Sequence, residues 1–338
     1  MKLKLWGTRG SLPRAIDNVK FVSLVDHYAK KAEKAGLTTI SDFRNAIRDG
    51  DLGDPLVFGG NTTCSEIIYQ NKRFFVDMGT GLADAASEVM SQGRTDFSIL
   101  LTHMHWDHIM GLPFFVPIYI PGSKITIYHV HANAPEYVKI QFNGINFPVK
   151  WEQLSATIEF KHIKLYSKLE FDGLTISPFN LDHPGGSFGY RFDAGGKSLA
   201  IGVDGEYKRL TPKDLGKDLP YYQNLDLLVF DAQYEMDELA SRFDWGHCSP
   251  PIGVDLCLRE GIRNLILTHH DPRSTEEKGD RMCMQATEHL KTQLPAYQEI
   301  WDGIGQPEGP HVQSAYDGME FNLDKIAPRL NKPKTGAA

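Results

Sequence analysis

Three histidines and one aspartate stand together in residues 102–108, which read THMHWDH. His103 and His105 are two residues apart and project the same way from an extended chain, whereas Asp107 and His108 follow where the chain turns. Each pair could hold one ion. Imidazole and carboxylate ligands suit zinc, and also manganese or iron. No cysteine stands nearby to suggest a closed structural site, so the pattern predicts a catalytic metal centre.

Further ligand-type residues follow later apolar runs. His183 lies in LDHPGG, Asp204 in GVDG and His269 in LTHHDP. Asp204 is a candidate to bridge two ions, because its two oxygens could be shared by metals about 3.5 to 4 Å apart. Taken alone, Asp204 could cap a turn and His183 could be a packed loop histidine. Together with residues 102–108, they predict a dinuclear site.

These side chains need sheets to position them. Residues 97–101 form a short apolar run typical of a buried parallel strand, and ligands of open α/β sheets collect at the C-terminal ends of such strands. Further strands are expected at 2–6, 66–69, 73–77, 124–129, 157–162, 174–179, 188–192, 198–203, 225–230 and 264–267. A terminal hairpin is expected from 311–316 and 319–323 around Asp317-Gly318.

Helical patterns place the chain in the α/β class. They are expected at 19–35, at 42–48 behind an N-cap at Ser41, after Asp231, after Pro250 and at 280–292. We expect one domain over residues 1–330, with a helical insertion at about 14–57 and a disordered tail at 331–338. A packing decoration is favoured for the insertion over a substrate lid or a dimer arm.

The composition of this 338-residue chain limits the classes of binding partner that are expected. The net charge is −7 and no basic block is present, which disfavours a nucleic-acid-binding arm. The four cysteines form no C-x-x-C pair, and no apolar run reaches membrane length. We therefore expect a cytoplasmic protein without a membrane partner.

The ordered set of THMHWDH, His183, Asp204 and His269 resembles the metallo-β-lactamase superfamily over nearly the whole chain. The resemblance implies a four-layer αββα sandwich with two divalent ions, zinc first among the candidates, and a homodimer. One ion would be held by His103, His105 and His183. The other would be held by Asp107, His108 and His269, with Asp204 between the two.

Two glycine-rich segments resemble the phosphodiesterase branch of that superfamily, which includes ribonuclease Z and cyclic-nucleotide phosphodiesterases. They are residues 6–11, WGTRGS, and residues 59–64, GGNTTC. The resemblance implies a phosphate pocket with Asn61 and Thr62 as substrate contacts, and His270 beside the metal ligand as a third. The alternative is that both segments are simply tight turns.

A histidine outside the ligand set points to phosphoryl chemistry. FDAQY contains Asp231 and WGHCS contains His247, an order similar to that of ribonuclease Z-like enzymes. The resemblance implies that Asp231 orients His247, which acts as general acid while a hydroxide bridging the metals attacks; Asp107 is the third catalytic candidate. The chain departs from the branch at Gly205, where threonine is common, and at Cys248, where serine or threonine is common. We interpret Cys248 as a small pocket wall.

The substrate expected first is a 3′,5′-cyclic nucleotide, hydrolysed to a linear monophosphate. Residues 179–192 and the segment HHDP resemble cyclic-nucleotide-degrading members, and no basic, glycine-rich RNA-binding arm is evident. An RNA-processing endonuclease of ribonuclease Z type is the alternative, and a non-catalytic metal-bearing binding protein is the second alternative. Among nearby aromatic residues, Phe114 and Phe115 are expected in the core, and Trp106 is left open.

Overall fold

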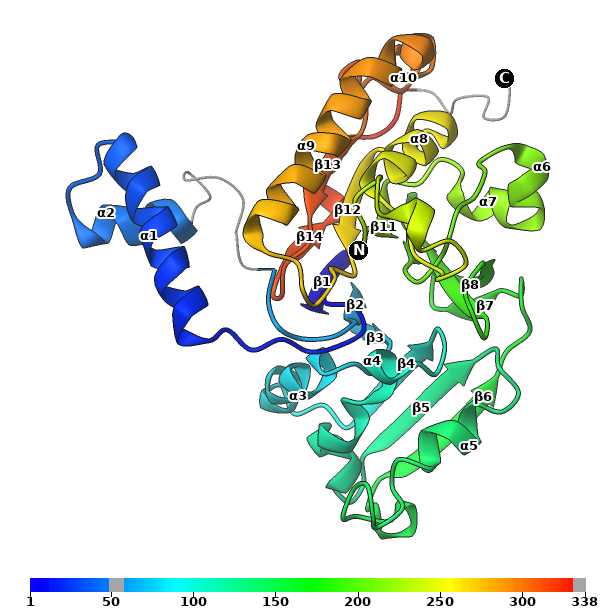
Figure 1. Cartoon of the computed structure of the whole chain (residues 1–338). Coiled ribbons are helices and arrows are strands. Elements are labelled where there is room, and N and C mark those ends of the chain that lie inside the picture. Colours follow the sequence, from blue (N-terminus) through cyan, green and yellow to red (C-terminus); the bar gives the residue numbers. More distant parts are fainter. Residues whose placement is uncertain (49–57, 331–338) are drawn as a thin grey trace.

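The computed structural model describes residues 1–48 and 58–330, and their strands form two seven-stranded sheets (Figure 1). The first sheet has the order β14 (Glu320–Asn322), β1 (Lys2–Gly7), β2 (Cys64–Tyr69), β3 (Lys72–Val76), β4 (Asp96–Leu101), β5 (Lys124–His129), β6 (Thr157–His162). The second has the order β13 (His311–Ser314), β12 (Asn264–Thr268), β11 (Leu227–Asp231), β10 (Lys197–Gly202), β9 (Ser187–Ala194), β8 (Leu174–Leu181), β7 (Leu169–Phe171). The two sheets provide the two inner layers of the fold.

The sheets pack face to face around a shared apolar core. Leu100 of β4 and Val229 of β11 belong to the same buried cluster, which draws on strands of both sheets. The neighbours of Leu100, Ile99 and Leu101, point to the opposite face and join a separate cluster there. Strand β4 is therefore buried on both faces, which explains why its sequence is a continuous apolar run instead of an alternating one.

Helices cover the two outer faces. Leu82 and Val89 of α3 (Gly81–Ser91) pack in the outer cluster of the first sheet, and Val254 of α8 (Pro250–Glu260) packs in that of the second. Met282 of α9 (Glu276–Gln293) and Trp301 of α10 (Gln298–Ile304) join the latter cluster. The remaining short helices on the two sheets are α4 (Trp106–Ile109), α5 (Ala134–Lys139), α6 (Pro212–Leu215) and α7 (Leu219–Tyr222). The expected αββα sandwich is confirmed.

Two helices stand apart from this sandwich (Figure 1). They are α1 (Asn18–Lys34), which begins after an N-cap at Asp17, and α2 (Ile40–Arg48). Their own small cluster includes Leu24 and Phe43 and, among the described residues, contains none from either sheet. The pair thus packs mainly on itself, and the choice between a decoration, a lid and a dimer arm stays a prediction. We propose that residues 1–330 form one domain from which this pair projects.

The capping of α2 also differs from the prediction. The hydroxyl of Thr39 accepts a hydrogen bond from the amide of Asp42 at 3.1 Å, so Thr39, and not Ser41, satisfies the first turn. The rest of the expected insertion, and the expected tail at 331–338, lie outside the described residues.

The predicted terminal hairpin is wrong. Strand β13 pairs in parallel with β12, whereas β14 pairs antiparallel with β1 in the other sheet. The turn at Asp317 and Gly318 therefore carries the chain from one sheet to the other, and each strand closes an edge. The reason is Asp317, whose carboxylate accepts hydrogen bonds from the amides of Thr8, Gly60 and Asn61.

Some smaller features of the structure also differ from the predictions made from the sequence. The helix expected after Asp231 is only a 3₁₀ turn at Leu239–Ser241, and the edge strand β7 was not predicted. Phe115 is buried as expected, but Phe114 is 61% exposed and does not belong to the core. In the described parts of the chain, no helix is long and apolar enough to cross a bilayer.

Candidate metal centre

The candidate ligands all follow the ends of strands. His103 and His105 follow β4, His183 follows β8, Asp204 follows β10, and His269 follows β12. Asp204 has a φ of 60° and His269 a φ of 63°, the left-handed region that costs a non-glycine residue about 1 kcal/mol. Unfavourable backbone conformations at two of the expected ligands indicate that the surrounding structure holds these side chains in place.

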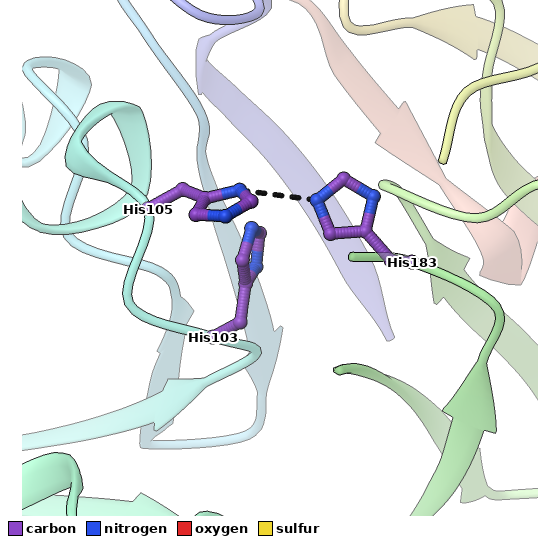
Figure 2. A group of neighbouring side chains, drawn as sticks. All are labelled: His103, His105 and His183. Atoms are coloured by element: carbon purple, nitrogen blue, oxygen red, sulfur yellow. Dashed lines mark hydrogen bonds between the residues drawn. The ribbon is translucent and has the colours of Figure 1, made fainter. Parts of the chain in front are cut away.

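Three histidines form the first group of donors. One ring nitrogen from each of His103, His105 and His183 lies within 4.8 Å of the others (Figure 2). The Nδ1 atom of His105 and the Nε2 atom of His183 are 3.1 Å apart. On the other side of the His183 ring, Nδ1 donates to the carbonyl of Gly246 at 2.9 Å, which turns Nε2 toward the group. The set matches a three-histidine cation site.

Asp107, His108, Asp204 and His269 form the second group. The Nε2 atom of His108 lies 2.5 Å from Asp204 Oδ2, and that of His269 lies 3.2 Å from Asp107 Oδ2. Buried polar atoms without an aligned hydrogen-bond partner among the described residues include Nε2 of His103, Nε2 of His108 and Oδ2 of Asp204. Buried polar atoms left this way normally indicate a missing partner, and a divalent cation could bind a lone pair of all three.

Two residues that were not predicted to contact the metal ligands orient them. Asp77, which follows β3, accepts hydrogen bonds from Nδ1 of His108 at 2.8 Å and from the amide of Thr102 at 2.8 Å. The amide of Ser11 donates to Asp107 Oδ2 at 2.7 Å. Asp77 had a signal, because it ends an apolar strand just as the other site residues do. Ser11 acts through its backbone, which side-chain patterns do not reveal.

Burial and charge act in opposite directions on the site. Burial lowers the pKa of His103 and His183, which favours neutral rings with a free lone pair. For His269, burial is outweighed by the carboxylates of Asp204, Asp107 and Asp231, which raise its pKa to about 9. Burial would raise the pKa of Asp107, yet neighbouring histidines hold it well below its usual value. Because the pKa values of Asp107 and Asp204 are both held below the usual value, these two carboxylates are ionised and suited to a cation.

His247 lies beside the second group and is held by Asp231. Its Nδ1 donates to Asp231 Oδ2 at 2.9 Å, which leaves Nε2 as the atom able to carry a second proton. Asp231 is fully buried, and it also accepts from the amides of Gln233, Cys248 and Asp204. The carboxylate of Asp231 lies close enough to Asp204, His247 and His269 for a cation site, but its oxygens are already engaged by these donors.

His270, a predicted substrate contact, lies in the protein interior. Its Nε2 donates to the carbonyl of Ala315 at 2.9 Å, and Phe58 stacks on its ring at a centroid distance of 4.0 Å. Burial, with the charge of Arg9, lowers the pKa of His270 to about 3. His270 is thus a neutral, buried structural residue.

Asn61 and Thr62 are also used within the protein. The amide group of Asn61 donates to Asp84 at 2.6 Å, and the hydroxyl of the buried Thr62 accepts from the amide of Thr80 at 2.9 Å. These contacts fix the loop after residue 58 against the start of α3, and substrate binding by Asn61 and Thr62 stays a prediction.

Cys248 and Trp106 lie in contrasting environments. Cys248 is fully buried in the cluster between the second sheet and its helices, and burial raises the pKa of its thiol far above the usual value. Trp106 is 79% exposed beside His105. Cys248 is thus an inert wall, whereas Trp106 stands on the surface next to the donors.

The sandwich with histidine and aspartate clusters at its strand ends defines the metallo-β-lactamase class of metal-dependent hydrolases. The clusters and the fold together indicate divalent metal ions. In agreement, residues 72–270, more than half of the chain, match the family described as "Beta-lactamase superfamily domain", and the chain belongs to that family.

Curated relatives and solved structures agree with this assignment. The chain is 24% identical over 254 residues to a ribonuclease Z from Listeria monocytogenes serotype 4b (strain CLIP80459), covering 62% of this chain and 81% of the relative. It is 27% identical over 187 residues to a ribonuclease Z from Staphylococcus carnosus, covering 50% of this chain and only 55% of that relative. The metallo-β-lactamase fold protein YhfI from Bacillus subtilis superposes with a TM-score of 0.61 at 14% identity, covering 95% of this chain and 98% of YhfI. The chain is therefore a ribonuclease Z-like member of the superfamily.

Proposed function

We propose that the protein is a metal-dependent phosphodiester hydrolase. One divalent ion would be held by His103, His105 and His183, and the other by Asp107, His108 and His269, with Asp204 shared between them. Zinc suits this nitrogen and oxygen donor set, and manganese or iron would also fit it. When bound, the ions would supply an activated water and neutralise charge on the phosphoryl oxygens.

The observation that carries the proposal is the pairing of His247 with Asp231. The thiolate released from a thioester is a good leaving group without a proton, whereas the alkoxide of a phosphodiester is a poor leaving group that benefits from one. His247 can supply that proton from Nε2, because Asp231 holds Nδ1–H and stabilises the protonated ring. Such a positioned acid contributes roughly 10²- to 10⁴-fold to the rate.

The substrate we favour is a 3′,5′-cyclic nucleotide. A net charge of −7 does not favour the many phosphate contacts that a long RNA requires, whereas one phosphodiester needs only the metal centre. Cleavage of RNA ends is the second candidate, because the curated relatives described above are named ribonuclease Z. We further propose a cytoplasmic homodimer, as the family resemblance implies.

A substrate screen tests the proposal. Protein reconstituted with Zn²⁺, Mn²⁺ or Fe²⁺ is incubated with 3′,5′-cyclic mononucleotides, cyclic dinucleotides and a 3′-extended transfer RNA, and the products are separated by chromatography. Linear monophosphates are expected. Cleavage of the RNA alone, with tight salt-dependent binding, would favour the second candidate, and turnover of none of these substrates would refute the proposal.

The variant His247→Ala tests the proposed acid. It should lower turnover of an alkoxide-leaving substrate by on the order of 100-fold while metal content stays at the wild-type level. His289 offers a matched control, because its Nε2 contacts Asp255 at 2.7 Å in a second histidine–aspartate pair, located on the outer helices. His289→Ala should retain activity. Loss of bound metal from His247→Ala would instead assign His247 to the ligand set.

A further inference from the structure

Glu206 holds the backbone that leads to His247. Its carboxylate accepts hydrogen bonds from two amides of one loop, that of Asp244 at 3.2 Å and that of Gly246 at 3.1 Å. Its own amide donates to the carbonyl of Asp182 at 2.8 Å. Glu206 thus joins the loop before His247 to the segment before His183.

Gly246 is the point where these contacts converge. Its amide donates to Glu206, and its carbonyl accepts from Nδ1 of the expected ligand His183 at 2.9 Å. Its φ is 83°, and a Cβ atom added there would lie 2.1 Å from His183 Nδ1. Only glycine allows this approach, and His247 is the next residue along the chain. The positions of His183 and His247 are therefore fixed relative to each other by one peptide unit.

A second link between the same segments is weaker. Lys208 forms ion pairs with Asp182 at 3.3 Å and with Asp244, but the side chains of both aspartates are largely exposed. Exposed ion pairs contribute about 0 to 1 kcal/mol, because solvent screens them and the side chains lose entropy. Bonds from a half-buried carboxylate to two backbone amides are charge-assisted and less easily replaced by water. Glu206 thus restrains residues 244–246 through both carboxylate oxygens, in addition to the bonds from the Trp245 amide to Arg242 and from His183 to the Gly246 carbonyl.

We propose that Glu206 is a positioning residue for His247, acting through the backbone of residues 244–246. This inference rests on the proposed function, in which His247 protonates the leaving oxygen. Without Glu206, the loop loses two hydrogen bonds and His247 samples orientations away from that oxygen. A displacement of about 1 Å at a reacting group can lower a rate by about 100-fold.

The test compares two leaving groups. An alkoxide, as released from cyclic AMP, needs protonation, whereas p-nitrophenolate, released from bis(p-nitrophenyl) phosphate, is stable without it. Glu206→Ala removes both acceptors and Glu206→Gln keeps one oxygen. Glu170→Ala is the matched control, because Glu170 is an exposed glutamate on the far edge strand β7 whose carboxylate accepts a bond from Thr175. Metal content and hydrogen exchange of a peptide covering residues 242–248 are measured for every variant.

Glu206→Ala should lower kcat for the alkoxide substrate by on the order of 10- to 100-fold and that for the p-nitrophenyl ester by less than about threefold. The loop peptide should exchange faster at unchanged metal content, and Glu206→Gln should fall between Glu206→Ala and wild type. An equal loss on both substrates, loss of metal, or unchanged exchange would each overturn the inference. Hydrogen exchange needs no turnover, so a wild-type protein inactive on every phosphodiester would refute the proposed function while the loop restraint is still measured.

Discussion

Replacing Asp231 by asparagine removes the negative charge of a side chain that binds both backbone amides and the proposed acid His247. The side chain keeps its shape, and its remaining oxygen can still accept from the amides of Gln233 and Cys248. The new NH₂ group, however, faces Nδ1 of His247, 2.9 Å from the former Oδ2, and the amide of Asp204 at 3.2 Å. The asparagine NH₂ group would then face two other hydrogen-bond donors, and it would be shielded from water because residue 231 is fully buried.

The expected cost follows from those contacts. A hydrogen bond to a charged group contributes roughly 1.5 to 3 kcal/mol, and one strong bond of this kind, to His247, is lost. With the amide of Asp204 also left unsatisfied, we expect Asp231→Asn to lower the free energy of unfolding by about 3 kcal/mol. Turnover should fall by at least about 100-fold, because His247 loses the group that fixes its tautomer and stabilises its protonated form.

Urea unfolding of the chelator-treated protein and steady-state turnover of the metal-loaded protein measure the two effects separately. Asp226→Asn is the matched control, because Asp226 is a buried carboxylate just before β11 whereas Asp231 is the last residue of that strand. It accepts from the amide of Ser198 at 3.0 Å, so its loss should affect stability but not turnover. Turnover of Asp231→Asn within about threefold of wild type would refute the reasoning about His247.

Three further predictions follow from the geometry. Gly246→Ala should reduce the amount of bound metal, because the added Cβ would displace His183. Elemental analysis measures the metal content, and a content equal to that of the wild-type protein would contradict the close approach described above. In chelator-treated protein, His269 has a pKa of about 9 against about 6.5 when unfolded, so its stabilising contribution is complete below pH 6.5 and is lost as the pH rises through 9. The free energy of unfolding, measured by urea titration, should therefore decline by up to about 3 kcal/mol over that range, and a flat profile would exclude this linkage. Asp317→Ala leaves the amides of Gly60 and Asn61 without an acceptor, while the Thr8 amide keeps the carbonyl of Asn61, and it should cost about 3 kcal/mol by thermal unfolding. A loss below about 1 kcal/mol would mean that water replaces the carboxylate.

The sequence was most informative where a side chain directly follows an apolar strand. His103, His183, Asp204 and His269 all fit that rule, and the structure brings them into two adjacent groups. Asp77 also fits it but stands among no other polar ligand types, so its relation to His108 became visible only in three dimensions. The alternation of strands and helices likewise predicted the α/β class, whereas the αββα sandwich was expected only from the resemblance to the superfamily.

Predictions failed where a contact distant in sequence decides the local structure. Asp317-Gly318 has the composition of a hairpin turn, but the carboxylate binds amides about 250 to 310 residues earlier in the chain and directs the next strand to the other sheet. Glu206 and Gly246 were missed for a related reason, because their contacts involve backbone groups. A pattern of side chains does not report which amide or carbonyl a residue will meet.

The crossing at Asp317 also has a consequence for how the protein is made. Strand β1 contains residues 2–7 but pairs on one side with β14, which contains residues 320–322, and β12 receives its neighbour β13 from residues 311–314. During synthesis, both edges therefore stay open until almost the entire described chain has left the ribosome. Open strand edges promote association with other chains, so the nascent protein depends on its last strands, or on chaperones, to protect both sheets. A ribosome stalled before residue 311 would carry a chain with every proposed metal ligand already made and both of these edges still unpaired.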